Sequence, residues 1–487
     1  MTRRAAGCSW TIALLALPLL AGCLGKTGIV LAPRHDASKT SALLWKDCGP
    51  SDSEETCAGR GDLEFAAYAK KAHAAIAAAR QAKKATAQFE SGETHVAAAL
   101  AGPVEWTPSV DRCPGRTEGV LLIHGLTDSP YAMRDLGEFF ADRDGRRFKD
   151  RCFLVRSILL PGHGTVPGDL SDRPSPPIDW REHWTTAVEY GVRTFPAKVS
   201  GVWLVGFSTG AALSIHQALS PGAEKIKGLI LISPAVRPKS PLAILADLHR
   251  AYSWAYVKAE WTDLHDDRDP VKYESFAKHA GWELVSLDVS LSGGWLPFLL
   301  RQKGPQVTRP VFMAISCQDD TVDAPAAIDF FNDRVAAGAL QKSRLVVFHG
   351  VPADPTIAKE YDETNTACKA RYDRTASDRL TVIPVASPDT KPRVLDLPHI
   401  ALPIAPGNEH YGERGDYRNC LHYLEAGQGK EFDDCRGAPL DKRLLGEKLK
   451  ANLEFARKDG KFLIRLGFNP QFEAMTERIR EFVLNVE

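Results

Sequence analysis

One serine stands out as a candidate nucleophile. Gly206-Phe207-Ser208-Thr209-Gly210 has the form G-x-S-x-G and lies between the apolar run GVWLVG and the segment AALSIHQAL, which has the length of a helix. A sharp turn from strand to helix needs small residues on both sides to hold the central side chain exposed. This setting predicts Ser208 as a nucleophile. The alternative is a serine that only caps the following helix.

The elements that would position Ser208 are short apolar runs rich in Val, Ile and Leu. Helix-length segments separate the six runs, which are GVLLIH (119–124), CFLVRSI (152–158), GVWLVG (201–206), GLILIS (228–233), PVFMAIS (310–316) and RLVVFH (344–349). Continuous hydrophobicity, without alternation, is typical of strands buried on both faces of a parallel sheet. The pattern predicts an α/β fold with a mostly parallel central sheet flanked by helices.

Five segments carry a resemblance to a known family. They are GVLLIHGLTDSPYAMRDL (119–136), LLPGHGT (159–165), VWLVGFSTGAAL (202–213), FMAISCQDDTVDAPAA (312–327) and LPHIALPI (397–404). Together they resemble α/β-hydrolases of the esterase, lysophospholipase and serine aminopeptidase-like group, here in a bacterial lipoprotein form. The resemblance samples roughly residues 115–487 and implies the α/β-hydrolase fold with an inserted lid. It also implies the order nucleophile, acid, histidine along the chain.

The resemblance implies an acid and a base for Ser208. The family often has Asp-x-x-Val after the strand that PVFMAIS represents, which favours Asp319 over the adjacent Asp320. The family histidine lies on a loop near the C-terminus, which favours His399 over His349 and His410. About 50 residues separate His349 from His399, more than a strand-to-loop connection needs.

The family also implies an oxyanion hole formed by the backbone N–H groups of Leu126 and Thr209. We expect His124 and His163 to anchor loops and to take no part in the chemistry. In the implied mechanism His399 takes the proton of Ser208 and Asp319 orients the imidazole, and water then hydrolyses an acyl-enzyme. This chemistry needs no metal and no organic cofactor.

The N-terminus predicts an export signal. Arg3 and Arg4 precede an apolar stretch from Trp10 to Leu20, which is shorter than the ~18 residues that span a bilayer. The sequence LAGC at 20–23 resembles the lipobox of bacterial lipoproteins, so we expect Cys23 to become the lipidated first residue. The alternative is an ordinary secretory signal. A lipid anchor on Cys23 implies the bacterial cell envelope, and the absence of Asp after it favours the outer membrane.

Eight cysteines follow Cys23, an even number for a chain routed to an oxidising space. They are Cys48, Cys57, Cys113, Cys152, Cys317, Cys368, Cys420 and Cys435. The spacing favours two short loops, closed by Cys48 with Cys57 and by Cys420 with Cys435. No pair has CxxC spacing, which argues against a zinc site.

The domain organisation follows from composition. We expect a signal at 1–22, a tether at 23–61, a helical extension at 62–105 and the hydrolase domain at 106–487. A lid is expected at about 235–300, where nine of 66 residues are aromatic against 41 of 487 overall, and an insertion at about 350–392. The lid aromatics, among them Trp254, Tyr256 and Trp295, favour an apolar substrate pocket, although they could equally form the lid's own core.

Several functions remain open at this point. Lys plus Arg and Asp plus Glu both number 61 and no basic stripe is present, which argues against nucleic-acid binding. The sequence favours a carboxylesterase or lysophospholipase-like hydrolase that acts on small-molecule or lipid esters. A peptidase or amidase would need a lid carboxylate for a substrate amine, and Glu260, Asp263, Asp266, Asp267 and Asp269 are available. A noncatalytic envelope protein and an acyltransferase are further alternatives, and the oligomeric state stays unknown.

Overall fold

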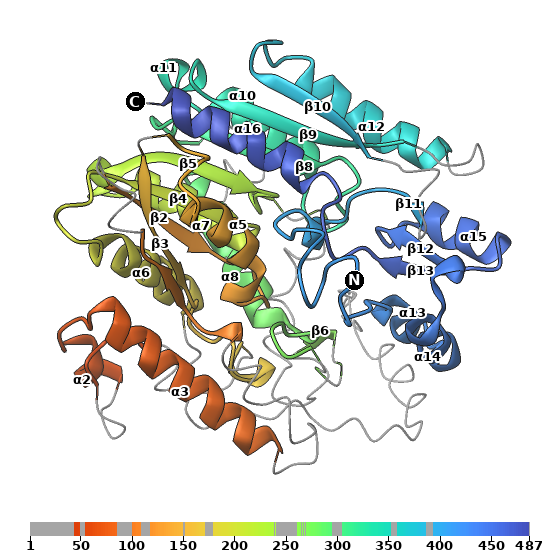
Figure 1. Cartoon of the computed structure of the whole chain (residues 1–487), viewed down its shortest axis with the longest axis horizontal. Helices are drawn as coiled ribbons and strands as arrows, with labels where there is room; N and C mark the ends of the chain where they lie inside the picture. The colour runs from red at the N-terminus through yellow and green to blue at the C-terminus, as the bar shows by residue number, and fades with distance from the viewer. Residues whose placement is uncertain are drawn as a thin grey trace, which may run out of the picture. The chain divides into compact units, whose positions relative to one another are not determined.

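The central element is a sheet of eight strands in the order β1-β3-β2-β4-β5-β8-β9-β10 (Figure 1). The computed structural model describes residues 43–48, 54–84, 100–108, 117–149, 151–170, 179–237, 239, 261–263, 265, 267, 269–294, 304–351, 358–385 and 393–486. The strands are β1 (Val104–Trp106), β2 (Thr117–Ile123), β3 (Cys152–Ile158), β4 (Val202–Phe207), β5 (Ile226–Ile232), β8 (Val311–Ser316), β9 (Arg344–Gly350) and β10 (Leu380–Val385). All neighbouring strands are parallel except β1, which pairs antiparallel with β3. The six predicted strands and the parallel sheet are confirmed.

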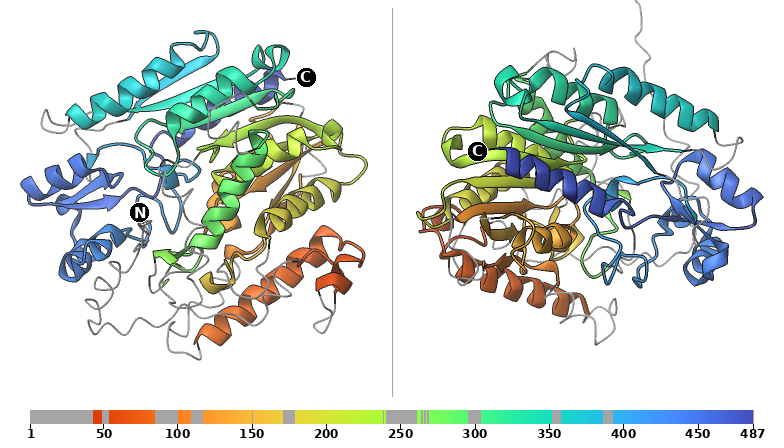
Figure 2. Two further views of the ribbon diagram at one scale, coloured as in Figure 1. Left: turned by 180° about the vertical axis from the view of Figure 1, so that it is seen from behind. Right: turned by 45° about the horizontal axis from the view of Figure 1, so that its top comes forward.

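Both faces of the sheet are covered, which explains the continuous hydrophobicity of its strands (Figure 2). In β2, Leu121 and Ile123 enter one core while Val120 and Leu122 enter the other. The first core includes residues of α3 (Phe65–Lys84), α6 (Trp180–Arg193), α7 (Thr209–Leu219), α8 (Lys278–Leu291) and α10 (Ala324–Arg334). The second includes residues of α5 (Arg134–Ala141) and α16 (Phe472–Asn485).

The expected insertion at about 350–392 contains a further unit of the sheet. Helix α12 (Ala358–Tyr372) leads into β10, and β10 pairs in parallel with β9. This helix and strand account for much of the distance between His349 and His399. The segment therefore extends the central sheet at its edge.

The expected lid at about 235–300 has mixed structure where it is described. It contains β6 (Trp261–Asp263), β7 (Phe276–Ala277) and α8, and β6 pairs antiparallel with β7. Helix α8 packs against α6 and α7, so residues 278–291 belong to the helical layer that covers one face of the central sheet. Trp254, Tyr256 and Trp295 lie outside the described residues, as do Glu260 and Asp266.

The expected tether at 23–61 is wrong for its described residues 43–48 and 54–61. Trp45 is 1% exposed and its ring stacks on Tyr190 with centroids 6.1 Å apart. The Cys48–Cys57 disulfide joins this segment to α2 (Glu54–Ala58). Burial of the indole against α6 fixes the segment to the domain, and the expected helical extension follows as α3.

Disulfides are present, as the even number of cysteines led us to expect. The two favoured pairs, Cys48–Cys57 and Cys420–Cys435, are confirmed, and a third joins Cys317 to Cys368. Cys152 is also disulfide-bonded, while Cys113 and Cys23 lie outside the described residues. Among the described helices, none is both long enough and apolar enough to cross a bilayer.

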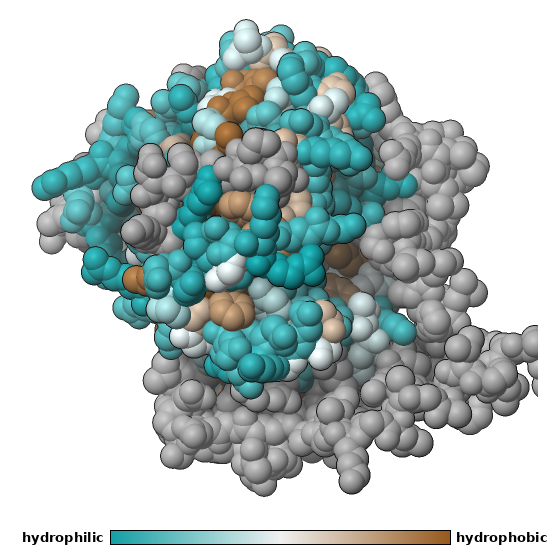
Figure 3. Space-filling view, turned by 90° about the vertical axis from the view of Figure 1, so that its right-hand side faces the viewer, coloured by the Kyte–Doolittle hydropathy of each residue, from teal (hydrophilic) through white to brown (hydrophobic). Residues whose placement is uncertain are grey.

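A second, smaller parallel sheet was not predicted. It has the order β11-β12-β13, formed by β11 (Arg393–Val394), β12 (Arg443–Gly446) and β13 (Phe462–Arg465). The helices α13 (Leu421–Glu425), α14 (Gly429–Gly437) and α15 (Lys450–Lys458) belong to the same C-terminal region. Figure 3 views the side on which Figure 1 draws these helices, where hydrophilic residues cover most of the coloured surface. The region is therefore solvated on that side.

Candidate active site

Ser208 occupies a strained turn between β4 and α7. Its φ of 53° and ψ of −116° are rare for a residue with a side chain, and its N–H donates to the carbonyl oxygen of Ile232 at 2.9 Å. A Cβ at Gly206 would lie 2.3 Å from the carbonyl oxygen of Gly210, and one at Gly210 would lie 2.1 Å from that of Ile123. The two glycines are required because backbone atoms fill the space that any side chain would need.

The structure brings Ser208, His399 and Asp319 together. The Nε2 atom of His399 lies 2.9 Å from the Oγ of Ser208, and its Nδ1 lies 2.6 Å from the Oδ2 of Asp319. The three residues are only 6%, 4% and 1% exposed. With Nδ1–H donating to the carboxylate, Nε2 is free to accept the hydroxyl proton of Ser208. This is the arrangement of a nucleophile, a base and an orienting acid.

Asp319, and not Asp320, faces His399. The Oδ1 of Asp319 accepts from the N–H groups of Thr321 and Val322 at 2.8 and 2.9 Å. Burial opposes ionisation, but the His399 ring and these hydrogen bonds outweigh it and lower the pKa of Asp319. The Asp320 side chain is 35% exposed and lies 3.5 Å from the Nζ of Lys239. The buried carboxylate is therefore held ionised at the imidazole.

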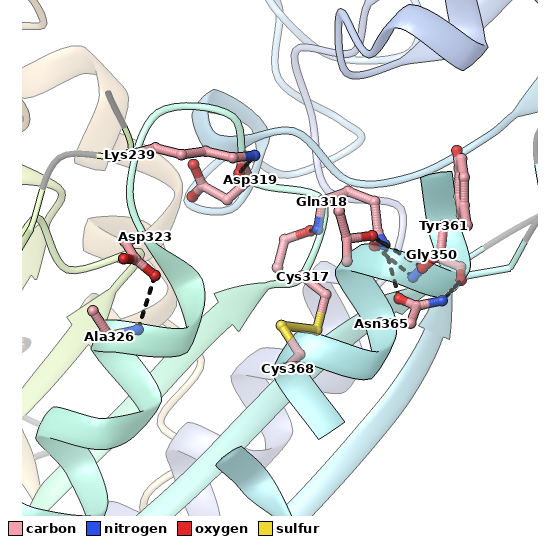
Figure 4. Close-up of a disulfide and its surroundings, with 12 residues drawn as sticks. Lys239, Cys317, Gln318, Asp319, Asp323, Ala326, Gly350, Tyr361, Asn365 and Cys368 are labelled. Carbon is pink, nitrogen blue, oxygen red and sulfur yellow. Dashed lines mark hydrogen bonds between the residues drawn. A yellow bond between two sulfur atoms is a disulfide. The ribbon is translucent and has the colours of Figure 1, made fainter. Parts of the chain in front are cut away.

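The loop that carries Asp319 is fixed to β9 and α12 by the two residues that precede Asp319 (Figure 4). The Cys317–Cys368 disulfide ties the end of β8 to α12. Gln318 is fully buried, accepts from the N–H of Gly350 at 2.7 Å and donates to Asn365 at 2.8 Å. We did not predict from the sequence that the disulfide and Gln318 support the acid loop, although Cys317 lies only two residues before Asp319.

His399 opens the 3-10 turn η8 (His399–Ala401), where its ring lies 5.0 Å from that of Phe207. The two competing histidines lie elsewhere. His349 belongs to β9, in register with Pro384 of β10. His410 lies between two carboxylates, with its Nε2 3.1 Å from Asp269 and its Nδ1 2.8 Å from Asp416. Neither histidine is hydrogen-bonded to Ser208.

The two residues expected to form an oxyanion hole line one cavity with Ser208 and His399. Thr209 is the first residue of α7, where a backbone N–H has no intrahelical acceptor and the helix dipole favours negative charge. Leu126 follows Gly125, at which a Cβ would lie 3.1 Å from the Cβ of Ser208. The absence of a side chain at Gly125 thus lets this backbone approach the nucleophile.

His124 and His163 hold loops in place. His124 accepts at Nε2 from the N–H of Leu160 at 3.0 Å, and its Nδ1 lies 2.8 Å from the carbonyl oxygen of Gly125. The Nδ1 of His163 lies 3.0 Å from the carbonyl oxygen of Pro161. Burial lowers the pKa of His124 to about 4, and burial together with His124 lowers that of His163 to about 3. Both rings are therefore neutral and contact main chain.

The cavity over Ser208 has a volume of about 630 Å³, within the usual range of small-molecule sites. Among the described residues of the expected lid, the aromatic residues that line it are Tyr273 and Phe276. Trp261 is buried in the core of the domain. The aliphatic lining comes from several elements and comprises Leu126, Ala235, Leu284, Val285, Val322, Ile400 and Leu421. An acyl chain fits such a surface.

One group among the described residues has ligand types that suit a metal ion. Asp263, His265 and Glu425 offer atoms that all lie within 4.8 Å of one another, and Asp263 and Glu425 also line the cavity over Ser208. The Nζ of Lys448 already lies 3.3 Å from the Oε2 of Glu425. The ammonium group supplies positive charge there, and the triad chemistry has no need of a metal.

The parallel sheet and the elbow serine together define the class. They are the architecture of an α/β hydrolase, and the model of the Alpha/beta hydrolase family matches residues 120–359. This span contains Ser208 and Asp319 and ends before His399. The chain therefore has the α/β-hydrolase fold, and these matches support the group that includes esterases and lipases.

Similar proteins include a thermostable monoacylglycerol lipase of Bacillus sp. (strain H-257), 29% identical over 118 residues. The alignment covers 24% of this chain and spans 41% of that relative's length. Among solved structures, the metagenome-derived lipolytic enzymes LipS and LipT match with 22% identity and a TM-score of 0.37, covering 52% of this chain and 88% of that chain. The monoacylglycerol lipase of Paleococcus ferrophilus matches with 16% identity and a TM-score of 0.36, covering 56% and 98%.

Proposed function

We propose that the protein is a serine hydrolase that cleaves carboxylic esters of apolar acyl chains. The observation that carries the proposal is the pair of hydrogen bonds joining Ser208, His399 and Asp319 at the wall of a mostly apolar cavity. The name of the Bacillus relative, a monoacylglycerol lipase, supports an ester of one acyl chain. We therefore favour single-chain lipid esters, including monoacylglycerols and lysophospholipids, as substrates.

The proposed reaction uses the same three side chains in both half-reactions. The Oγ of Ser208 attacks the ester carbonyl as its proton passes to Nε2 of His399, and the N–H groups of Leu126 and Thr209 bind the oxyanion. The imidazolium then protonates the leaving alcohol as the C–O bond breaks, which leaves an acyl-enzyme. Water repeats the sequence with His399 as base and releases the carboxylic acid.

A serine-reactive fluorophosphonate tests this proposal directly. We expect the parent chain to be labelled and Ser208→Ala to remain unlabelled, because the probe needs an activated hydroxyl. The elimination of labelling must coincide with the loss of nitrophenyl ester hydrolysis. Equal labelling of the two chains would refute Ser208 as nucleophile, and an unlabelled parent would favour a noncatalytic protein.

The apolar lining sets an expected dependence on chain length. Each further methylene buried contributes at most ~0.8 kcal/mol, or about fourfold in kcat/KM, until the cavity is full. Rates should rise from acetate to at least hexanoate. Leu284→Trp places an indole on the cavity wall formed by α8 and should shift the optimum to shorter chains. Flat or falling rates in the parent would reject the acyl pocket.

A peptidase or amidase is a second candidate because Asp263 lines the same cavity. The carboxylate of Asp267 instead accepts hydrogen bonds from the N–H groups of Glu274 and Ser275, and that of Asp269 accepts one from the hydroxyl of Tyr411. Among the candidate lid carboxylates that the structure describes, Asp263 is thus the one that lines the cavity and could meet a substrate amine. Aminoacyl anilides cleaved faster than hexanoate esters, with loss of that preference in Asp263→Asn, would favour this candidate.

We further propose a lipid anchor on Cys23 and location at the outer membrane. The support is the LAGC sequence at 20–23 after a short apolar run, with Leu at position 24. Metabolic labelling with a fatty-acid analogue should mark the parent and not Cys23→Ser. Equal labelling of both would exclude this anchor, and inner-membrane fractionation of the labelled parent would exclude the proposed membrane.

A further inference from the structure

The small sheet directs three charged residues toward the catalytic loops. Asp396 follows β11 by two residues, Glu447 follows β12 directly, and Arg465 is the last residue of β13. Because the three strands are parallel, their carboxyl ends meet at one edge of the sheet. His399 follows β11 in the chain and lies at this same edge.

Glu447 and Arg465 form a buried two-point ion pair. The Nε of Arg465 donates to Oε1 of Glu447 at 2.7 Å, and its Nη2 donates to Oε2 at 3.1 Å. The side chains are 0% and 15% exposed. Paired planar groups of this kind have defined geometry, so each fixes the orientation of the other.

Each member of the pair also contacts one catalytic loop. The Oε2 of Glu447 accepts from the backbone N–H of His399 at 3.4 Å. The Nη2 of Arg465 donates to the hydroxyl of Thr321 at 3.3 Å, and the N–H of Thr321 donates to Asp319 at 2.8 Å. The ion pair therefore joins the loop of the base to the loop of the acid.

Asp396 fixes the pair to the strand that precedes His399. It is fully buried and accepts from the N–H of Glu447 at 2.6 Å, the hydroxyl of Tyr361 at 2.5 Å and Nδ2 of Asn452 at 2.8 Å. The approach to His399 and the turn that carries Glu447 thus share one buried anchor.

We propose that Glu447 and Arg465 are positioning residues that hold His399 against Asp319, and that the Glu447 carboxylate, fixed in place by Arg465, stabilises the charge on the imidazole during proton transfer. The inference rests on the proposed ester hydrolysis. Catalytic groups displaced by about 1 Å can lose about 10²-fold in rate, so a rigid link between base and acid loops has a direct effect on turnover.

The electrostatic part of the proposal predicts opposite shifts for the two partners. The other charged groups around these loops are Asp319, Asp320, Asp396, Lys239 and Lys448. Glu447→Gln removes a negative charge and leaves the Arg465 cation, which disfavours the imidazolium. The acid limb of the kcat/KM profile should move to lower pH by roughly one unit. Arg465→Met leaves the carboxylate and should move the limb to higher pH.

The experiment compares parent, Glu447→Gln, Arg465→Met and Glu118→Gln. Glu118 is a matched control, since it is 2% exposed and paired with Lys227 at 2.6 Å, and it lies near the amino end of β2. We expect a 10- to 100-fold loss of kcat in Glu447→Gln with little change in KM. The control should keep the rate and the profile.

A second measurement needs no turnover and therefore separates this inference from the proposed function. The His399 ring is titrated by NMR in histidine-labelled protein, with assignment from His399→Gln. Opposite movements of its midpoint in the two variants would support the positioning pair even in a chain without esterase activity. Midpoints and rates equal to those of the parent, or changes matched by Glu118→Gln, would overturn it. The midpoint in Glu447→Gln alone decides the case if Arg465→Met does not fold.

Discussion

Replacing Asp319 by asparagine tests the histidine tautomer. In the parent, the Oδ1 of Asp319 accepts from the N–H groups of Thr321 and Val322, and Oδ2 faces Nδ1 of His399 at 2.6 Å. An asparagine whose oxygen stays on the two backbone donors turns its NH₂ group toward the imidazole. The Nδ1 atom then becomes an acceptor and the ring proton moves to Nε2. In that tautomer Nε2 cannot accept the proton of Ser208.

The structure decides which orientation the asparagine takes. Turning its oxygen toward His399 would leave the N–H groups of Thr321 and Val322 facing an NH₂ group. Each buried donor left unsatisfied costs about 1 to 3 kcal/mol, so the inactive orientation is favoured. In serine proteases, the corresponding loss is about 10⁴ in kcat, equivalent to about 5 kcal/mol. We expect Asp319→Asn to approach this value.

Asp320→Asn is the matched control for this substitution. Its partly exposed carboxylate lies 3.5 Å from the Nζ of Lys239, and a surface pair of this kind contributes at most about 1 kcal/mol. The expected loss is less than about fivefold. The assay is kcat/KM for nitrophenyl butyrate, with thermal unfolding to show that both variants fold. Equal losses, or a larger loss in Asp320→Asn, would contradict the assignment of the acid.

Three further predictions concern the framework of the site. Gly210→Ala should abolish folding or fluorophosphonate labelling, because its Cβ would lie 2.1 Å from a carbonyl oxygen of β2. The control Gly338→Ala, in α11 (Ala337–Leu340), meets no atom within 4 Å and should change the free energy of unfolding by at most about 1 kcal/mol. Thermal unfolding measures the stability of both variants. Replacing Cys420 and Cys435 by serine opens a 15-residue loop and should lower the free energy of unfolding by about 3 kcal/mol in urea titrations; an unchanged midpoint would contradict this. Burial lowers the pKa of His410, but the two adjacent carboxylates outweigh burial and raise the pKa above its usual value. The stabilisation that protonated His410 gives to the folded state is therefore fully present below about pH 6.5 and is lost as pH rises through the raised pKa. His410→Gln should therefore lower the melting temperature more at pH 6 than at pH 9, and an equal or opposite difference would contradict the ion pairs.

The central sheet and the residues now found around Ser208 were accessible to sequence reasoning because their signals are local. Each buried strand of six or seven residues leaves a continuous apolar run, and the G-x-S-x-G turn is fixed by steric contacts within a few residues. The register of parallel strands then brings Ser208 and Asp319 to one edge. The choice between Asp319 and Asp320 needed the structure, since adjacent carboxylates differ only in the direction that the loop gives them.

The small sheet lacks such a signal. Its strands have two to four residues, and only Leu444, Leu445, Phe462, Leu463 and Ile464 mark the longer two as apolar. The polar sequence around them matches a surface loop as well as a strand. Glu447 and Arg465 follow His399 by 48 and 66 residues, and no local pattern links residues at such separations. Their convergence is a property of the tertiary fold alone.

The long connection before His399 does not loosen the site, because the chain is fixed at both ends of it. After Asp319 the chain adds α12 and β10 to the edge of the central sheet, and the Cys317–Cys368 disulfide holds that addition beside the acid loop. The chain then enters β11, where Asp396 is anchored by Glu447 just before His399. The central sheet thus supplies the nucleophile and the acid at the carboxyl ends of its strands. The small sheet β11-β12-β13 supplies the residues that support the base, also at the carboxyl ends of its strands. Asp319 and His399 are therefore 80 positions apart in sequence and yet hydrogen-bonded in the fold.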